Sequence, residues 1–328
     1  MSSSVTYAEA IVIGLVQGVA ELFPISSLGH AVLIPAFIGG SWATTLNMTA
    51  PDSPYLALVV ALHVATALAL LVFFWRDWVR VFKGFVSSIK YKRIETPYER
   101  LAWLLIAGTV PVGLAGLVLD KLLREHLGKP VYAGAFLALN GVLLYSVERL
   151  RSAENKKKAG SSNRRKSGST PVPATATADG SKFTPEYDKH GQLLPESIAS
   201  DVRLSRLSFK TGVLLGSAQI LGLFPGLSRS GSSIALGIFK GLHHEDAARF
   251  AFLLATPVIM LAGIYKMPEL TEPANSGIIG PAIAGSVVAF LASLISVRYL
   301  VKYFETRTLT PFAIYCFVVG IGSVAYFA

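Results

Sequence analysis

Runs of consecutive apolar residues, each nearly 20 residues long, recur along this chain and constrain its fold more than any other feature. Such a run is long enough to cross the hydrocarbon core of a bilayer as a helix. The composition agrees, because 52% of the 328 residues are hydrophobic and only 15% are charged, whereas soluble domains carry about 25% charged residues. The sequence therefore predicts an all-α protein that crosses a membrane several times.

Six segments have the length and composition of complete membrane spans. Two of them contain an internal proline, which the neighbouring helices of a membrane protein can accommodate. The expected spans cover residues 55–75, 101–119, 131–146, 247–265, 278–297 and 309–327.

Two further apolar segments, residues 8–38 and 207–242, are interrupted in the middle by proline, glycine and hydroxyl residues. A broken backbone cannot face lipid, because each unpaired N–H or C=O group there costs several kcal/mol. We therefore expect each segment to be a re-entrant helix–loop–helix pair whose break lies inside the protein and lines a cavity.

The two interruptions resemble each other in sequence. Leu-Phe-Pro at residues 22–24 recurs at residues 223–225, and Ser27 matches Ser228 at the same offset. Each interruption is followed by three expected spans. This pattern favours an internal repeat over the alternative of two unrelated broken helices. The predicted organisation is a first repeat, a flexible basic linker and a second repeat, at residues 1–150, 151–206 and 207–328.

The positions of the basic residues indicate the orientation in the membrane. Residues 1–75 contain no Lys or Arg, whereas residues 76–100 contain seven. The positive-inside rule places the second stretch in the cytoplasm of a plasma membrane protein. Both termini are then external, the linker is cytoplasmic, and the two re-entrant pairs enter from opposite faces, as in an inverted-topology repeat. Because the net charge of +10 is confined to loops, it does not indicate a nucleic-acid partner.

Polar residues of the first interruption suit a metal ion. Gln17 and Glu21 are spaced i,i+4 and share a helix face. Their oxygens suit a hard divalent cation, Mg²⁺ or Ca²⁺, with diphosphate oxygens completing its shell. Ser26, Ser27 and His30 follow the break, and either serine can cap the next helix.

Residues of the second interruption suit a phosphate-like anion. Arg229 lies among Ser228, Ser230 and Gly231, just before an apolar half-helix. An arginine beside the free N–H groups of a helix N-terminus is typical of phosphate binding. Gln219 precedes this break and either lines the cavity or holds helices together.

A structural role stays open for several of these residues. Glu21 can pair with Arg229 only to neutralise two buried charges, and His30 can be a satisfied structural histidine. Ser26, Ser232 and Ser233 can be simple helix caps. His63, alone in an otherwise apolar span, is interpreted as structural.

Three motifs together resemble the signature motifs of the undecaprenyl-diphosphate phosphatase family linked to bacitracin resistance. They are Gln17-Gly-Val-Ala-Glu21, Pro24-Ile-Ser-Ser-Leu-Gly-His30 and Pro225-Gly-Leu-Ser-Arg-Ser-Gly231. The resemblance covers roughly residues 6–150 and 205–328. It implies an inverted repeat of six spans with two re-entrant helix pairs. It also implies cleavage of the terminal phosphate of undecaprenyl diphosphate, which returns the lipid carrier for cell-envelope synthesis.

The position and chemistry of the candidate residues lead to an expected role for each of them. Ser27 is expected to be the nucleophile with His30 as general base or acid, and Glu21 with Gln17 to hold Mg²⁺ or Ca²⁺. Arg229 is expected to be catalytic, by binding the terminal phosphate and stabilising the charge that grows on it. Substrate binding is expected from Ser26, Ser228, Ser230, Gly231 and Gln219. Two departures are Leu28, where the family often has Ser or Thr, and a linker longer than expected. A lipid-phosphate flippase or transporter is the competing function, and a homodimer stays open.

Overall fold

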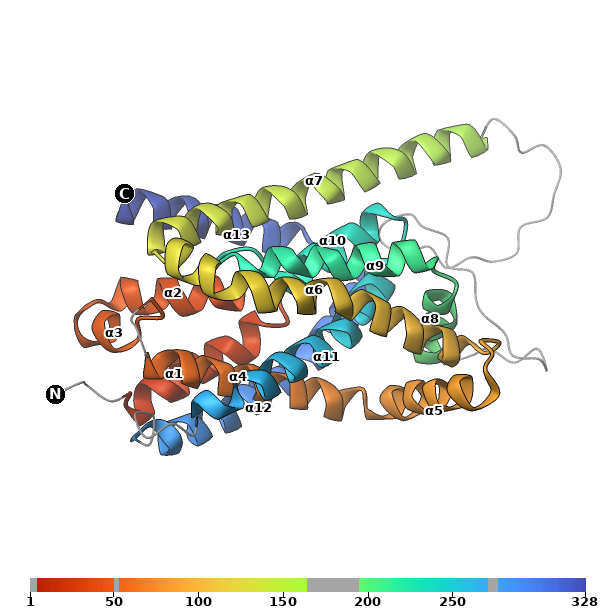
Figure 1. Ribbon diagram of the computed structural model, residues 1–328. Helices are drawn as coiled ribbons and strands as arrows, with labels where there is room; N and C mark the ends of the chain where they lie inside the picture. Colours follow the sequence, from red (N-terminus) through yellow and green to blue (C-terminus); the bar gives the residue numbers. More distant parts are fainter. Residues whose placement is uncertain (1–4, 50–52, 164–194, 271–276) are drawn as a thin grey trace.

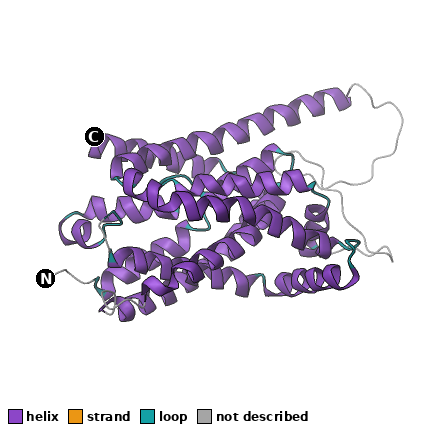
Figure 2. Ribbon diagram, viewed as in Figure 1, coloured by secondary structure: helices purple, strands orange, loops and turns teal. Residues whose placement is uncertain are grey.

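The computed structural model describes residues 5–49, 53–163, 195–270 and 277–328, and these residues form helices and loops without any strand (Figures 1 and 2). The elements in chain order are α1 (Tyr7–Ala20), α2 (Ser27–Ile38), α3 (Gly40–Thr45), α4 (Pro54–Phe73), α5 (Trp75–Tyr91), α6 (Pro97–Leu127), α7 (Pro130–Asn163), α8 (Glu196–Ser205), α9 (Phe209–Ala218), the 3₁₀ helix η1 (Gln219–Leu223), α10 (Arg229–Phe239), α11 (His244–Leu270), α12 (Ile279–Thr306) and α13 (Thr310–Phe327).

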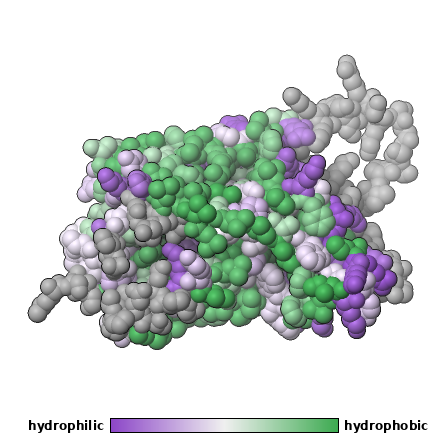
Figure 3. Space-filling view, viewed as in Figure 1, coloured by the Kyte–Doolittle hydropathy of each residue, from purple (hydrophilic) through white to green (hydrophobic). Residues whose placement is uncertain are grey.

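Among the described residues, six helices are long and apolar enough to cross a membrane, so the six expected spans are confirmed. They cover Pro54–Phe73, Pro97–Leu119, Pro130–Glu154, His244–Lys266, Ile279–Thr306 and Thr310–Phe327. Helix α11 continues through Pro257, whereas Pro281 falls in the first turn of α12, where a missing N–H removes no helical hydrogen bond. Hydrophobic residues cover most of the face seen in Figure 3, and hydrophilic residues gather at the end where α5 and α8 lie.

Both interrupted segments contain short helices on either side of a break, as the sequence predicts. The breaks lie between α1 and α2 and between η1 and α10, and they meet inside the protein. The backbone N–H of Gly226 donates to Ser26 Oγ at 3.1 Å across the junction. Gly226 has φ +111°, and a Cβ on Gly29 would lie 2.8 Å from the Gly226 Cα. Only glycine allows the two backbones to approach this closely.

Helices from the two halves of the sequence pack against each other on both sides of this junction. Helix α1 packs on α12 and α7 packs on α13. Small residues let the backbones approach, since a Cβ on Gly14 would collide with Gly285 and a Cβ on Gly141 would collide with Ala313. Close packing through small residues is the usual way in which helices associate in lipid. The two breaks are therefore held in the centre of a single bundle.

The structure differs from the expected linker at both of its ends. Helix α7 continues to Asn163, and α8 packs on α6 and α11. Two ion pairs hold α8 against α11. Arg203 Nη2 of α8 lies 2.7 Å from Asp246 Oδ1, and the buried Asp201 of α8 lies 2.9 Å from Arg249 Nε. Helix α8, which lies within the predicted flexible linker, is therefore a packed part of the fold. The remainder of the predicted linker, residues 164–194, lies outside the described residues.

Candidate functional site

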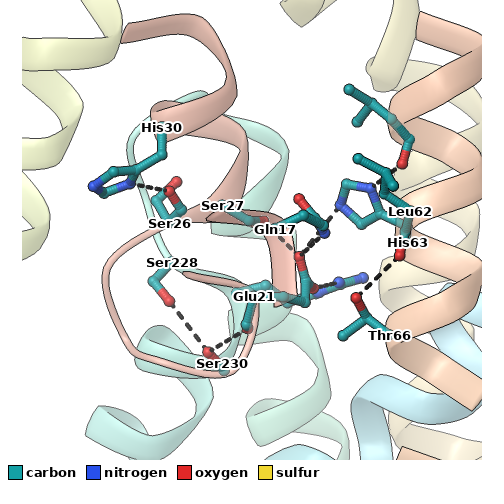
Figure 4. Close-up of polar contacts among 12 residues, drawn as sticks. Gln17, Glu21, Ser26, Ser27, His30, Leu62, His63, Thr66, Ser228 and Ser230 are labelled. Atoms are coloured by element: carbon teal, nitrogen blue, oxygen red, sulfur yellow. Dashed lines mark hydrogen bonds and ion pairs between the residues drawn. The ribbon is translucent and has the colours of Figure 1, made fainter. Parts of the chain in front are cut away.

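The carboxylate of Glu21 is the centre of the candidate site (Figure 4). Its side chain is 5% exposed, and Oε1 forms an ion pair with Arg229 from the other half of the chain. Oε2 accepts hydrogen bonds from Ser27 Oγ at 2.5 Å and from Gln17 Nε2 at 3.0 Å. The structure thus brings together four predicted site residues. The pairing of Glu21 with Arg229 is present, and the hydroxyl of Ser27 joins it.

Ser228, Ser230 and Gly231 begin helix α10 and tie it to the first break. Ser228 Oγ accepts the N–H of Gly231 at 3.0 Å, which caps the helix. Ser230 Oγ donates to the backbone carbonyls of Glu21 and Leu22 at 3.3 and 3.4 Å. These contacts place the N-terminus of α10 beside Glu21, where the partial positive charge of the helix end favours an anion.

His30 and Ser26 lie on the far side of the first break from Glu21 (Figure 4). His30 Nδ1 lies 2.7 Å from the Ser26 carbonyl oxygen, and Nε2 lies 2.7 Å from the hydroxyl of Tyr315. Ser26 has a φ of +69°, and its Oγ caps α2 by accepting the N–H of Gly29 at 3.2 Å. A non-glycine residue holds this backbone only when its surroundings fix it. Through these two contacts, the imidazole of His30 is bound to the Ser26 carbonyl and to Tyr315 and not to Ser27.

Asn140 of α7 is a central polar residue that sequence reasoning missed. Its Nδ2 donates to the Pro24 carbonyl at 2.9 Å, and its Oδ1 accepts the Ser228 N–H at 3.1 Å. One fully buried side chain therefore holds both breaks. The available signal was a single asparagine inside an otherwise apolar span, because polar side chains in lipid need partners.

His63 of α4 also reaches the site, although the sequence favoured a structural interpretation. Its Nε2 lies 3.3 Å from Glu21 Oε2, and its side chain is 24% exposed. Its Nδ1 lies 2.8 Å from the Val59 carbonyl one turn earlier. The signal in the sequence was a lone histidine in a membrane span. Its role could not be assigned from the sequence, because its partner Glu21 comes from the end of a different helix.

A cavity of about 1060 Å³ opens from this group of side chains. Glu21, Ser27, His63 and Arg229 line it, as do Ser26, Ser228 and Gln219, whereas His30 does not. The amide of Gln219 is fully buried, and neither of its polar atoms has a hydrogen-bond partner among the described residues. Of the two positions that the sequence left open for Gln219, the structure has the one on the cavity wall. The remaining wall is largely apolar and comes mainly from α4, α5, α6 and α11.

The family model for the bacitracin resistance protein BacA matches residues 10–176 and 183–322. The chain belongs to the BacA family. Similar curated proteins include the undecaprenyl-diphosphatases of Mycolicibacterium paratuberculosis and Mycobacterium avium, 55% and 54% identical over 100% of this chain and 99% of each relative. Undecaprenyl-diphosphatase 2 of Frankia alni is 48% identical over 98% of both chains.

Two of the oxygen-bearing side chains in this site, Glu21 and Gln17, are of the kind that binds a divalent cation. Among the described residues, no group of three or more His, Cys, Asp or Glu side chains could hold a metal ion. Glu21 and Gln17 nevertheless lie together, with 3.0 Å between Nε2 and Oε2, and Glu21 lines the cavity. Mg²⁺ is commonly bound by one or two carboxylates, with substrate phosphates and water as its other ligands. The residues present are compatible with that arrangement.

Proposed function

We propose that this protein hydrolyses undecaprenyl diphosphate to the monophosphate and inorganic phosphate, the activity that its relatives' names give to those proteins. One observation carries the proposal: a serine hydroxyl donates to a buried carboxylate at 2.5 Å, beside an arginine, at the wall of a largely apolar cavity. A transporter of lipid phosphates needs the arginine but has no need of a hydroxyl held by a base. Hydrolysis is therefore favoured over transport.

In the proposed reaction, Ser27 Oγ attacks the terminal phosphorus while its proton passes to Glu21 Oε2. The bond from that phosphorus to the bridging oxygen breaks, and this oxygen leaves on the lipid monophosphate. Arg229 and the N-terminus of α10 stabilise the negative charge on the transferred phosphoryl group. A water molecule then attacks this phosphorus, the bond between phosphorus and Ser27 Oγ breaks, and Oγ takes back the proton from Glu21 as inorganic phosphate leaves. His30, which contacts the Ser26 carbonyl, positions the residue before the nucleophile.

The apolar part of the cavity suits a polyprenyl chain. Leu114 and Leu117 of α6 and Leu261 of α11 line the cavity and are also exposed on the outer surface. The cavity wall is therefore continuous with the surface that faces lipid, so the polyprenyl chain can pass from the hydrocarbon core into the cavity without crossing water. We expect the diphosphate to lie at Glu21 and the chain to leave past these residues.

A divalent cation, Mg²⁺ or Ca²⁺, would be held by Glu21 with the help of Gln17. When bound, it would neutralise charge on the diphosphate. Gln219, with its unpartnered amide on the cavity wall, would bind a phosphate oxygen through its N–H₂ group.

Purified protein in detergent is expected to release phosphate from undecaprenyl diphosphate in Mg²⁺ or Ca²⁺. Chelation with EDTA should lower the rate at least about tenfold, because charge neutralisation by a metal contributes several kcal/mol. Undecaprenyl monophosphate, which has no anhydride bond, is the control and should release none. Absence of phosphate release from the diphosphate with either ion would contradict the proposed function.

The packing supports an inverted repeat with two re-entrant pairs. Helix α1 packs on α12, and its counterpart α9 packs on α6; α4 packs on α11, and α7 on α13. These contacts are those expected when one half is related to the other by a two-fold rotation. The start of α1 and the end of α13 lie at one end of the molecule, and α5 and α8 at the other (Figure 1). We place the first end outside the cell, because the other end carries the basic residues.

Cysteine labelling on intact cells is expected to show this orientation. Ser41 of α3 and Lys92 after α5 are both exposed and lie on opposite sides in the proposed topology. In a background in which Cys316 is replaced by alanine, an impermeant thiol reagent should label S41C and leave K92C unlabelled. Permeabilised cells, in which both should react, are the control. The reverse pattern would overturn the proposed orientation.

A further inference from the structure

The imidazole of His63 presents its two nitrogens to two different oxygen atoms (Figure 4). Nδ1 lies 2.8 Å from the Val59 carbonyl oxygen, which only accepts hydrogen bonds, so Nδ1 is the nitrogen that donates there. Nε2 lies 3.3 Å from Glu21 Oε2, and in the tautomer with its hydrogen on Nδ1 this atom has a free lone pair. Two ligand atoms at this separation can both bind one cation that lies about 2.1 Å from each of them. Histidine ligands of metals are commonly oriented by such an N–H contact to a backbone carbonyl.

Gln17 supplies a third donor at the same position. Its amide contacts Glu21 Oε2 at 3.0 Å, and turning the amide over places its oxygen where the nitrogen lies, because the two atoms have nearly the same shape. Neighbouring ligands of an octahedral ion with bonds of about 2.1 Å are about 3 Å apart. The separations of both donors from Glu21 Oε2 are close to this value.

We propose that His63 is a ligand of the divalent cation, together with Glu21 and Gln17. This inference rests on the proposed function, which requires the cation, and adds a ligand from α4 to it. Imidazole suits transition ions, whereas Mg²⁺ and Ca²⁺ prefer oxygen. The set of one imidazole, one carboxylate and one amide therefore favours Mn²⁺ over Ca²⁺.

The geometry separates the cation from the arginine. Glu21 turns Oε1 to Arg229 and Oε2 to His63. Arg229 and a cation bound at His63 would therefore contact different oxygens of the same carboxylate. Glu21, His63 and Arg229 all line the cavity. A diphosphate bound there can contact the arginine through one phosphate oxygen and the cation through another. Because Glu21 contacts both positive groups, it fixes the distance between the arginine and the cation.

Electron paramagnetic resonance of Mn²⁺ tests the inference without an activity readout. Purified full-length protein is loaded with Mn²⁺ and methylenediphosphonate, a diphosphate mimic that cannot be hydrolysed. Spin-echo modulation from an imidazole nitrogen is expected in the wild type and should be absent in His63→Phe. Loss of the ligand should also weaken Mn²⁺ binding at least about tenfold, since even outer-shell changes weaken metal affinity by this factor.

His126→Leu is the matched control. Like His63, His126 contacts the carbonyl one turn earlier, at 2.9 Å from Leu122, but it is exposed. This variant should keep both the modulation and the affinity. His63→Gln, which retains a polar side chain, should bind Mn²⁺ without imidazole modulation, and its melting temperature and elution profile report correct folding. Wild-type protein without Mn²⁺ binding or without nitrogen modulation would overturn the inference, as would modulation that persists in His63→Phe. Phosphate release by the same wild-type preparation, measured before methylenediphosphonate is added, shows separately whether the proposed function holds.

Discussion

Replacing Arg229 by alanine is expected to lower kcat for phosphate release from undecaprenyl diphosphate at least about 100-fold. Removal of one major electrostatic group from an active site costs this much, because the charge that develops on the reacting phosphate is left uncompensated. The variant also leaves the Glu21 carboxylate, which is 5% exposed, without its ion-pair partner. Initial rates measured over a range of substrate concentrations separate the loss in kcat from any rise in KM.

Two further variants test whether the loss of kcat comes from the missing guanidinium group and not from unfolding. Breaking a buried ion pair destabilises proteins by about 3–5 kcal/mol, so the melting temperature of each variant is measured as well. Arg229→Lys keeps the charge but not the two-pronged geometry, and it should recover part of the rate. Ser232→Ala alters the same helix, where Ser232 Oγ donates to the Ser228 carbonyl at 2.8 Å, and should stay within a few-fold of wild type. A folded Arg229→Ala protein with normal kcat would remove Arg229 from the mechanism.

Ser27→Ala is expected to reduce phosphate release by at least about 100-fold, because the hydroxyl that donates to Glu21 Oε2 at 2.5 Å is the attacking group. The experiment uses substrate labelled with ³²P in its terminal phosphate and quenches the wild-type reaction within the first turnover. A labelled phosphoserine at Ser27 is expected in the wild type and should be absent from Ser27→Ala.

Ser233→Ala is the control for this variant. Ser233 is equally buried in the bundle, but its Oγ donates to the Leu215 carbonyl at 2.7 Å, away from Glu21. Its substitution should leave the rate nearly unchanged. Full activity of Ser27→Ala would transfer the attack to a water molecule activated by Glu21. Glu21 and Arg229 would then keep their proposed roles, and only the covalent step would be removed.

Local sequence was enough to predict the six membrane-spanning helices and the two broken segments. The six spans appear as expected because a backbone in lipid must satisfy its own hydrogen bonds, whatever it packs against. The breaks were predicted for the same reason, since proline, glycine and serine end a helix locally. The contact between Glu21 and Ser27, which the sequence did not predict, joins two residues six positions apart across the first break.

Sequence-based expectations differ from the structure where contacts with distant residues, and not the local sequence, decide the position of a segment or side chain. Helix α8 looks like part of a polar linker, because the residues that stabilise it, Asp246 and Arg249, lie far along the chain. His30 lies three positions after Ser27 on the first turn of α2, and a side chain so near in sequence was expected to reach it. The helix turns the imidazole to the other side, where Tyr315 of α13 accepts or donates at 2.7 Å.

The sequence by itself determined that the chain lies in a lipid bilayer, how many times it spans the bilayer, where the two breaks fall and which residue types are available for chemistry. These properties depend on composition and on periods of a few residues, which each segment carries independently of the rest. Only the tertiary structure decided which of the polar residues meet. Arg229 reaches Glu21 across 208 positions, His63 arrives from α4, and Asn140 joins both breaks from α7. Such contacts depend on how helices rotate and pack against distant partners, and no local pattern encodes that rotation.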